Sequence, residues 1–487
     1  MLELNIELES QSREPLFQQI ARKIAEAIQQ GRLRPGERLP GSRKLAQSLG
    51  VHRNTVLTAL EELAAQGWLT QKPRSGTFVS ERIPELQTLE EAQPISLLPK
   101  DLGFAFHPIA ARKPTTPNNS DTALVMAGGW PEVRYLPLTE LARAYRQVLQ
   151  RQGFALLSYG DPAGHPALRH ELARMLAQRR GLSVSADDIV LTHGAQMGIF
   201  LSAQLLIRPG DVVAVEQFGY PPAWTALRTA GAHLEPLPVD SEGLCVDALE
   251  SLLRRTPVRA VYLTPHHQFP TLAVMSASRR LQLLELARQH RFALVEDDYD
   301  HEFHYDGQPV LPLASADTTG VVIYIGTLSK VLAPGLRAGF VIAPPPFRDA
   351  LIALRSHLDR QGNHAQEAAL ANLFEDGLIE RHIRKMRKLY RTRRDHLHQE
   401  LQTHLSSALS YDLPRGGLAI WAKVLEPWSA QQWSQIGKQR GVHFESGDVY
   451  MFDQSSQPYL RLGFARLNEE ELTEAVVRMK QALEDSH

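Results

Sequence analysis

The most constraining feature of the sequence is a series of short, continuous apolar runs after residue 121, each separated from the next by a longer stretch with helical periodicity. These runs are 189–191, 212–215, 260–263, 293–295 and 321–324. Short apolar runs without polar alternation are typical of strands that are buried on both faces of a parallel sheet. We therefore predict an α/β domain over 121–487 with a mostly parallel sheet, and a ligand site beyond the carboxyl ends of its strands.

Residues 1–80 follow a different pattern, which predicts three helices and then a β-hairpin. The apolar residues of the first helix recur at helical spacing: Phe17, Ile20, Ile24 and Ile28. Pro15 and Gly31 bound this helix, and Ser42 is expected to cap the second. The predicted helices are 15–30, 42–49 and 53–66, and the predicted strands are 68–70 and 77–79. This order is typical of an α+β winged helix-turn-helix domain.

Residues 81–120 connect the two patterned regions. They contain six prolines and show no periodicity, which predicts a semi-rigid linker. The stretch 95–109 is fairly apolar, so an irregular arm packed on the following domain is an equally good interpretation of that part. The predicted domains are therefore 1–80 and 121–487, joined by a linker over 81–120.

The charge balance restricts where nucleic acid could bind. The 487-residue chain has 53 Lys and Arg against 54 Asp and Glu, so any basic surface must be local. Residues 13–80 hold eleven Lys and Arg against five Asp and Glu, which places that surface in the first domain. Cys245 is the only cysteine, which excludes an internal disulfide and a multi-cysteine zinc site; we predict no metal site and expect a reducing compartment.

The start of the chain lacks the pattern of a signal peptide, and no apolar run reaches the roughly 20 residues that span a bilayer. We therefore expect a cytoplasmic, nucleoid-associated protein without a membrane partner.

The first domain offers a DNA-binding surface. The second helix of a helix-turn-helix presents its first residues to the major groove, while flanking bases contact phosphates. The candidate DNA-binding residues are Arg43, His52, Arg53, Asn54, Thr55, Lys72, Arg74, Ser75 and Gly76. They predict a double-stranded DNA operator as partner, and the alternative is a basic domain that docks a protein.

Polar residues that follow two of the predicted strands form a second candidate site. Asp297 and Tyr299 come after the run 293–295, and Thr327 and Lys330 come after 321–324. A lysine amine, a carboxylate, a phenol and an anion site are the groups that pyridoxal 5'-phosphate (PLP) requires of a protein.

We predict a PLP Schiff base at Lys330, with Asp297 at the ring nitrogen and Tyr299 at the phenolic oxygen. Arg337 and Thr327 are expected at the phosphate, and Arg337 is also expected to lower the pKa of Lys330.

Other residues complete this predicted site. Ala195 and Gln196 lie in a turn that opens a helix, where free amides bind an anion. Tyr220 is placed to stack on the cofactor ring, and Arg461 to pair with the carboxylate of an effector. His267 and Gln268 are further candidates near the phenolic edge.

The first domain resembles the winged helix of the GntR family in four motifs. These are 39–46 (LPGSRKLA), 50–56 (GVHRNTV), 67–69 (GWL) and 75–79 (SGTFV). Residues 121–487 resemble fold-type I PLP-dependent aminotransferases in Asp297-x-Tyr299, Ser329-Lys330, Arg337 and the upstream motifs 159–164 and 192–196. In this order the two domains resemble the MocR subfamily of GntR-type regulators.

The second resemblance implies an α/β domain followed by a smaller C-terminal α+β subdomain. It also implies a homodimer in which Tyr159 reaches the cofactor phosphate of the partner subunit.

The combined resemblance implies a transcription regulator that senses PLP, an amino acid or an amine through Lys330. Two alternatives remain: an active aminotransferase that carries a DNA-binding head, and a DNA-binding protein with an inert, enzyme-like dimerisation domain. The effector, the operator and the sign of regulation are left open.

Overall fold

The computed structural model describes residues 8, 14–72, 75–81, 123–126, 128–307 and 310–485. The chain divides into two compact units, Met1–Ala111 and Arg112–His487. Arg74 and all of the predicted linker except Glu81 lie outside the described residues. The two interpretations of the linker and the role of Arg74 therefore stay predictions.

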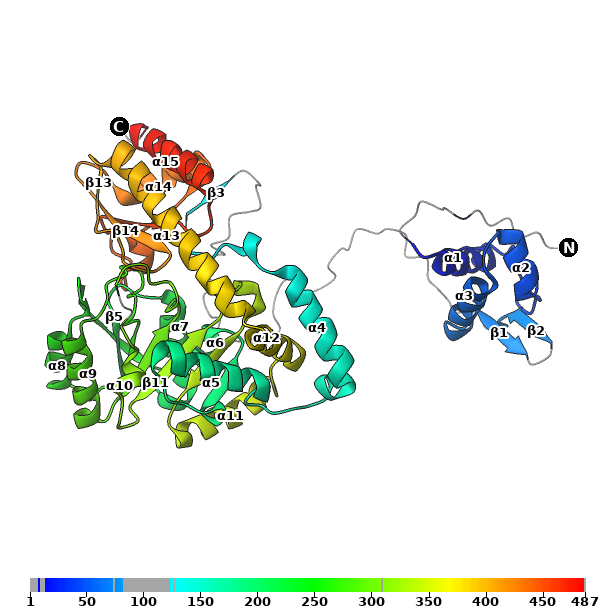
Figure 1. The fold of residues 1–487 in the computed structure, drawn as a ribbon, viewed down its shortest axis with the longest axis horizontal. Helices are drawn as coiled ribbons and strands as arrows, with labels where there is room; N and C mark the ends of the chain where they lie inside the picture. Colours follow the sequence, from blue (N-terminus) through cyan, green and yellow to red (C-terminus); the bar gives the residue numbers. More distant parts are fainter. Residues whose placement is uncertain are drawn as a thin grey trace, which may run out of the picture. The chain divides into compact units, whose positions relative to one another are not determined.

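The first unit is a three-helix domain with a two-stranded wing (Figure 1, blue). Its elements are α1 (Leu16–Gln29), α2 (Ser42–Leu49), α3 (Arg53–Ala65), β1 (Leu69–Lys72) and β2 (Gly76–Val79). The wing strands are antiparallel, with Leu69 opposite Val79. The isoleucines predicted to be internal are buried in one core with residues of α3. The predicted winged helix-turn-helix is confirmed.

Local details of this unit differ slightly from the prediction. Ser42 is the first residue of α2 and not its cap, since the cap position is held by Gly41. Gly50, with a φ of 65°, ends α2 in the left-handed conformation that glycine adopts most easily. His52 caps α3 because its Nδ1 accepts a hydrogen bond of 3.3 Å from the Asn54 amide.

The second unit is built on a large sheet. In the described part of the chain this sheet has seven strands, in the order β4-β12-β11-β10-β9-β5-β6. The strands are β4 (Ile189–Thr192), β5 (Val212–Glu216), β6 (His233–Leu237), β9 (Ala260–Leu263), β10 (Ala293–Asp298), β11 (Val322–Thr327) and β12 (Gly339–Ile342). β12 is antiparallel to both neighbours and the other pairs are parallel. The five predicted strands are confirmed, whereas β6 and β12 were not predicted.

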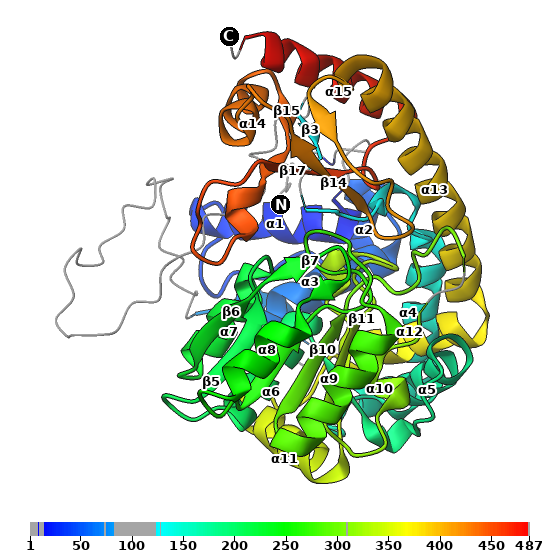
Figure 2. The ribbon, with the colours of Figure 1, turned by 90° about the vertical axis from the view of Figure 1, so that its left-hand side faces the viewer.

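Helices cover both faces of this sheet, as Figure 2 shows. The helices of this part are α4 (Leu138–Gln152), α5 (Pro166–Arg180), α6 (Ala195–Leu206), α7 (Pro221–Thr229), α8 (Val246–Leu253), α9 (Ala277–His290), α10 (Leu313–Ala316), α11 (Pro345–Leu358) and α12 (His364–Glu375). Of these, α4 packs against α12 and not against the sheet. Val261 and Leu294 pack with residues of α5, α8 and α9, while Val213 and Val295 pack with those of α6 and α7. The continuous apolar runs follow from this burial on two faces.

A smaller α+β layer completes the unit. Its strands are β13 (Leu409–Ser410), β14 (Ala419–Val424), β16 (Glu445–Ser446) and β17 (Tyr459–Gly463), joined in an antiparallel sheet. Its helices are α13 (Leu378–Leu405), α14 (Ala430–Gln439) and α15 (Glu469–Glu484). In Figures 1 and 2, α13 runs from the helices beside the large sheet to this layer, which confirms the predicted C-terminal subdomain.

Short elements connect these parts. β3 (Leu124–Val125) pairs with β15 (Val442–His443), and β7 (Val239–Asp240) pairs with β8 (Gly243–Leu244). The 3-10 helices are η1 (Val133–Tyr135), η2 (Gly153–Leu157), η3 (Ala186–Asp188), η4 (Pro334–Leu336) and η5 (Gly447–Tyr450). No helix in the described part of the chain has the length and apolar character that crossing a membrane requires.

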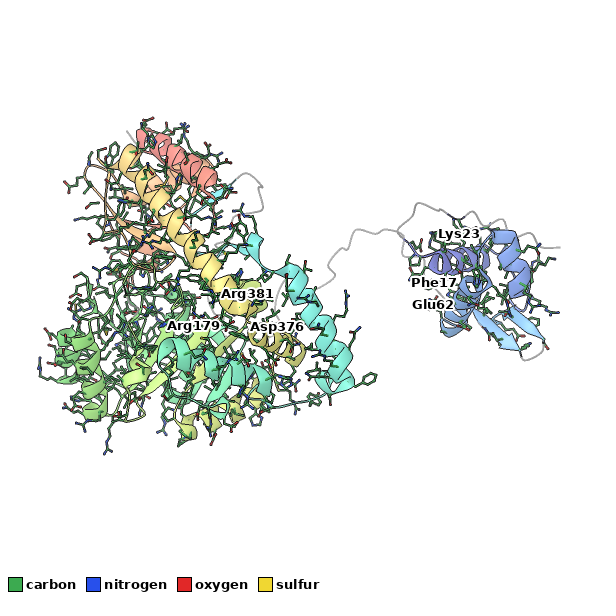
Figure 3. All side chains as sticks on the ribbon, in the orientation of Figure 1. Phe17, Lys23, Glu62, Arg179, Asp376 and Arg381 are labelled. Carbon is green, nitrogen blue, oxygen red and sulfur yellow. The ribbon has the colours of Figure 1, made fainter. Side chains whose placement is uncertain are left out.

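A glycine separates helix α12 from helix α13. Gly377 has a φ of 65°, and the Arg381 guanidinium reaches back to donate a hydrogen bond of 3.0 Å to the Asp376 carbonyl (Figure 3). This contact satisfies a carbonyl group left over at the end of α12. It also fixes the point from which α13 departs towards the smaller layer.

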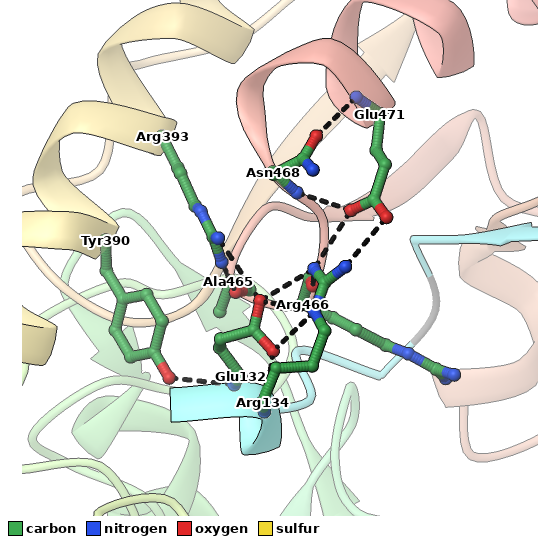
Figure 4. A network of polar contacts seen from close by, with 8 residues as sticks. All are labelled: Glu132, Arg134, Tyr390, Arg393, Ala465, Arg466, Asn468 and Glu471. Atoms are coloured by element: carbon green, nitrogen blue, oxygen red, sulfur yellow. Dashed lines mark hydrogen bonds and ion pairs between the residues drawn. The ribbon is translucent and has the colours of Figure 1, made fainter. Parts of the chain in front are cut away.

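A polar network ties the segment before α4 to the smaller layer (Figure 4). The buried Glu132 carboxylate pairs with Arg134 at 2.7 Å and with Arg393 of α13 at 3.2 Å. Arg134 also pairs with Glu471 in the first turn of α15, and the Glu132 amide donates to the Tyr390 hydroxyl. The residues just before Glu132 are thereby held against α13 and α15.

Candidate functional site

A cavity of about 300 Å³ lies beyond the carboxyl ends of β10 and β11, between the large sheet and the smaller layer. Nine of the residues predicted for the cofactor and the effector line it: Ala195, Gln196, Tyr220, Asp297, Tyr299, Thr327, Lys330, Arg337 and Arg461. They come from several elements that are far apart in the sequence. The fold therefore brings together almost the whole predicted set.

Asp297 is the penultimate residue of β10 and lines this cavity. Its Oδ2 accepts a hydrogen bond of 2.7 Å from the Tyr262 hydroxyl, whereas its buried Oδ1 has no partner among the described residues. Burial raises the pKa of Asp297 to about 7, with further raising by the charges of Asp298 and Asp300. A buried, unpaired carboxylate oxygen of this kind fits a cationic ring nitrogen.

Lys330 follows β11 and points its amine at the wall opposite. Its Nζ lies 3.5 Å from the Gly129 carbonyl oxygen, and burial together with the charge of Arg461 lowers the pKa of the amine to about 8. We expected Arg337 to produce this effect. That expectation was wrong, because Arg337 does not contribute to the shift and the cation that acts on Lys330 is Arg461.

Arg337 lies beside the start of α6, where Ala195 and Gln196 begin the helix. Its Nη2 donates a hydrogen bond of 2.7 Å to the His193 carbonyl, so the guanidinium borders the turn that precedes α6. The first amides of a helix have no partner within it and attract an anion. The hydroxyl of Thr327 donates to the Ala338 carbonyl at 3.0 Å and accepts from the Ser329 amide at 3.1 Å, which fixes the loop that carries Lys330.

Aromatic side chains form the walls of the cavity. Tyr220 and Tyr299 both meet the Phe269 ring edge to face, with centroids 5.5 and 5.9 Å away. The Tyr299 hydroxyl donates a hydrogen bond of 3.0 Å to the His267 carbonyl, and burial raises its pKa well above the usual value. His267 and Gln268 do not line the cavity; the His267 ring instead pairs with Asp300 at 2.8 Å.

Arg461 is a buried cation on β17. Its guanidinium carbon lies 4.6 Å from the centre of the Phe269 ring, and its Nε and Nη1 have no partner among the described residues. Gly129 has a φ of 56°, and a Cβ there would lie 3.1 Å from Arg461 Nη1, so glycine allows this close approach. Two unpaired donors on a buried guanidinium are suited to a carboxylate ligand.

Several residues of this site were not predicted from the sequence. Tyr262 was treated as an apolar strand residue, and neither the segment 128–130 nor Glu445 and Tyr450 carried a recognisable motif. Their position depends on how the smaller layer packs over the large sheet, which no local pattern reveals. The network of Figure 4, which holds the residues just after this segment, likewise joins parts of the chain that are far apart in the sequence.

Tyr159, like His267 and Gln268, lies outside the cavity. Its side chain is 83% exposed and lies under the Arg360 guanidinium, 5.8 Å from the ring centre. Other apolar side chains of the same region are also exposed, including Phe154 and Leu157.

The predicted DNA-binding residues that the structure describes lie on the outside of the first unit. Arg43, His52, Arg53 and Asn54 are exposed around the start of α3, and Lys72 is exposed on the wing, where its amine lies 5.1 Å from the centre of the Phe78 ring. Arg53 Nε donates to the Ser42 hydroxyl at 3.3 Å, which links α2 and α3. Thr55 is half-buried, and Ser75 and Gly76 are exposed at the wing turn.

Both units match known protein families. Residues 16–79 match the gntR family of bacterial regulatory proteins, and residues 130–479 match the class I and II aminotransferases, a PLP-dependent family. The chain is 30% identical over 472 residues to MocR, a probable rhizopine catabolism regulatory protein of Rhizobium meliloti, covering 96% of this chain and 94% of that protein. It is 31% identical over 492 residues to the HTH-type transcriptional regulator TauR of Rhodobacter capsulatus, covering 96% of each.

A solved structure resembles the second unit. The α-aminoadipate aminotransferase LysN of Thermus thermophilus, complexed with N-(5'-phosphopyridoxyl)-L-leucine, has a TM-score of 0.70 and 27% identity, covering 75% of this chain and 93% of that one.

A winged helix-turn-helix followed by an aminotransferase-type domain defines a class of DNA-binding regulators built on an enzyme fold. This chain belongs to the MocR subfamily of GntR-type regulators, with its second unit in the class I and II aminotransferase family. The predicted family and the predicted fold class are both confirmed.

Proposed function

We propose that the protein is a transcription regulator that binds PLP at Lys330 and senses PLP itself, an amino acid or an amine in the same cavity. One observation carries the proposal: a lysine of lowered pKa, a carboxylate with an unpaired oxygen and an arginine with unpaired donors face one enclosed space. Perturbed ionisable groups gathered in a cavity indicate a functional site.

The chain's own residues fit the groups of PLP. Asp297 Oδ1 would accept a hydrogen bond from the protonated ring nitrogen. Tyr299, two residues further along the chain, lines the same cavity. Arg337 and the amides at the start of α6 would hold the phosphate. The structure of LysN with a phosphopyridoxyl amino acid supports this assignment by analogy of fold.

The bound cofactor supplies an aldehyde carbon that captures primary amines and a ring that withdraws electrons. Lys330 supplies the attachment point, since an amine with a pKa of about 8 is partly neutral near pH 7 and therefore nucleophilic. Arg461 would bind the carboxylate of an amino acid and so orient its amine towards Lys330. Burial of these groups excludes water from the contact.

We further propose that two chains form a homodimer. The exposed ring of Tyr159 and the exposed Phe154 and Leu157 support this assignment, because exposed apolar groups clustered on one region favour a partner surface. A dimer would present two winged helices to an operator with two half-sites.

Gel-shift assays with the gene's own upstream DNA test the regulator proposal. We expect sequence-selective binding by the full chain that changes when PLP is added, and no response to PLP in Lys330→Ala. Lys385→Ala, on the exposed side of α13, is the matched control. Absence of selective binding with and without PLP would refute the proposal.

The competing function is catalysis as an aminotransferase. The partly neutral Lys330 amine supports this alternative, because such an amine can accept and return a proton. Single-turnover spectroscopy with a panel of amino acids separates the two. Formation of pyridoxamine phosphate and a keto acid would indicate an aminotransferase, whereas a lasting complex without a keto product indicates a sensor.

A further inference from the structure

Glu445 is an acidic side chain that lines the cavity. The proposed cofactor binding assigns no role to this residue. It lies on β16 directly opposite Arg461 on β17, since the two residues are register partners in the antiparallel pair. Opposed residues of an antiparallel pair place their side chains on the same face of the sheet. Glu445 and Arg461 therefore both face the space that an effector would enter.

The charged residues lining the cavity are Asp297, Lys330, Arg337, Glu445 and Arg461. Four of them have a counterpart in the proposed complex: Arg337 faces the cofactor phosphate, Asp297 the ring nitrogen, Lys330 the aldehyde carbon and Arg461 the effector carboxylate. Only the carboxylate of Glu445 is left without an opposite charge. A half-buried charge that remains unpaired in an occupied site is costly.

Glu445 is not neutralised from within the chain. No lysine, arginine or histidine nitrogen of the described residues lies within ion-pairing distance of its carboxylate. Its partner is the Tyr450 hydroxyl, which donates a hydrogen bond to Oε2 and holds the side chain in place without changing its charge. Arg461, across the strand pair, lies instead over the Phe269 ring, and its Nε and Nη1 have no partner among the described residues.

The surroundings of Glu445 suit a cation. The Tyr450 ring lines the cavity and its hydroxyl contacts Glu445, while the Phe269 ring, 5.3 Å from it by centroids, carries the Arg461 guanidinium. Aromatic faces attract ammonium and guanidinium groups, and a carboxylate among them strengthens that preference. An effector with an uncharged side chain would make only apolar contacts with this wall, and Glu445 would remain without an opposite charge.

We infer that the effector is an amino acid with a second, distal cationic group, and that Glu445 is the residue that selects it. The inference rests on the proposed function and specifies the class of ligand: a carboxylate for Arg461, an α-amine for the cofactor and a distal ammonium or guanidinium for Glu445.

Calorimetric titration of the PLP-loaded full chain tests this inference. The probes are L-lysine and L-ornithine against L-norleucine and L-citrulline, which have similar length and a neutral end. We expect the basic amino acids to bind at least about tenfold more tightly than the neutral ones, as a charge-assisted contact in a partly buried site provides. Equal affinities would overturn the inference, and this comparison needs no variant.

Glu445→Gln identifies the responsible residue. We expect it to reduce the affinity for L-lysine about tenfold, to that of L-norleucine, and to leave L-norleucine within about twofold of the wild-type value. Glu470→Gln, an exposed glutamate on α15, is the matched control and should change neither. Preserved selectivity in Glu445→Gln would overturn the role of this residue.

The outcomes also separate the inference from the proposed function. Binding of neutral and basic amino acids with equal affinity refutes the inference and leaves the sensor intact. Failure of the chain to bind PLP would refute both the inference and the proposed function. It would be seen if the wild-type protein, like Lys330→Ala, showed no visible absorbance band when PLP is added.

Discussion

At the scale of single residues, Tyr262 opposes the effect of burial on the pKa of Asp297. Its hydroxyl donates the one hydrogen bond that opposes the raised pKa of this buried carboxyl. Tyr262→Phe should raise that pKa further above about 7, so less carboxylate is present at neutral pH. We expect the Kd for PLP at pH 7 to rise about tenfold, the value of one hydrogen bond to a charged group.

A fluorescence titration with PLP measures this change. Tyr411→Phe is the control, since that hydroxyl contacts His398 on α13 away from the cavity. An unchanged Kd in Tyr262→Phe would show that Asp297 does not depend on this contact.

Burial and the charge of Arg461 both lower the pKa of Lys330. The pKa of Lys330 is lowered from 10.5 to about 8 by burial and by Arg461, so the nucleophilic neutral amine gains population as pH rises through about 8. Arg461→Met removes the repulsion and retains the burial. We expect the midpoint of the pH profile for covalent PLP capture by the PLP-free protein to move up by about one unit.

Stopped-flow absorbance measures this profile, with the exposed Arg384→Met as control. An identical midpoint in Arg461→Met would leave burial as the only cause of the shift.

How far single residues could be predicted depends on where their neighbours come from. Lys330 and Asp297 were predicted because they lie at or just after the ends of strands that meet at one edge of the sheet, and Arg337 because it follows Lys330 closely in the sequence. Glu445 was not, since only its pairing with Arg461 across β16 and β17 brings it to the cavity. Assigning the lowered pKa of Lys330 to Arg337 failed for the same reason: sequence proximity was a poor substitute for spatial proximity.

At the scale of elements, the Glu132 network joins the segment before α4 to α13 and α15. Glu132→Gln removes the charge that pairs with Arg393, whose side chain is 1% exposed, and should cost about 3–5 kcal/mol of unfolding free energy. Arg134→Met removes a half-exposed cation and should cost only about 1 kcal/mol. Urea denaturation of both variants measures the difference.

The pH dependence of this network has a defined sign. Although burial opposes it, hydrogen bonds from Arg134 hold the pKa of Glu132 below its usual 4.5. The contribution of Glu132 to stability is therefore complete above about pH 4.5 and is lost as pH falls through the lowered pKa. In Glu132→Gln this loss should be absent. A wild-type-like acid transition in that variant, or equal costs for the two substitutions, would contradict the assignment.

The predictability of elements followed their hydrophobic pattern. The five strands buried on both faces were found because they are continuous apolar runs. β6 was missed because only Leu234 and Leu237 of its five residues are buried and Pro236 lies between them, so it shows neither a continuous apolar run nor a strict alternation. β12 was not predicted although it is also a continuous apolar run buried along its length; only its antiparallel direction has no signal in the sequence pattern.

At the scale of the whole molecule, the first unit should read DNA through two separable sets of contacts. Asn54 is exposed at the start of α3, where base edges are read, and Arg43 is exposed on α2. Asn54→Ala should weaken operator binding about 10- to 100-fold with little effect on unrelated DNA. Arg43→Ala should weaken both about equally and reduce the slope of log affinity against log salt by about one.

Fluorescence anisotropy with operator and scrambled DNA over a range of salt concentrations distinguishes these effects. If both variants lowered affinity for both DNAs equally, α3 would contact phosphate alone.

Each unit has a hydrophobic core of its own, so communication between them requires that the effector bind two arrangements of the molecule with different affinity. Such coupling is reciprocal. If L-lysine changes operator affinity by some factor, typically about 5- to 150-fold, saturating operator DNA must change the affinity for L-lysine by the same factor. Paired calorimetric and anisotropy titrations measure the two factors, and Lys330→Ala should reduce both to one. An operator affinity that does not respond to L-lysine, or a response that persists in Lys330→Ala, would show that binding in the cavity is not coupled to the DNA-binding unit.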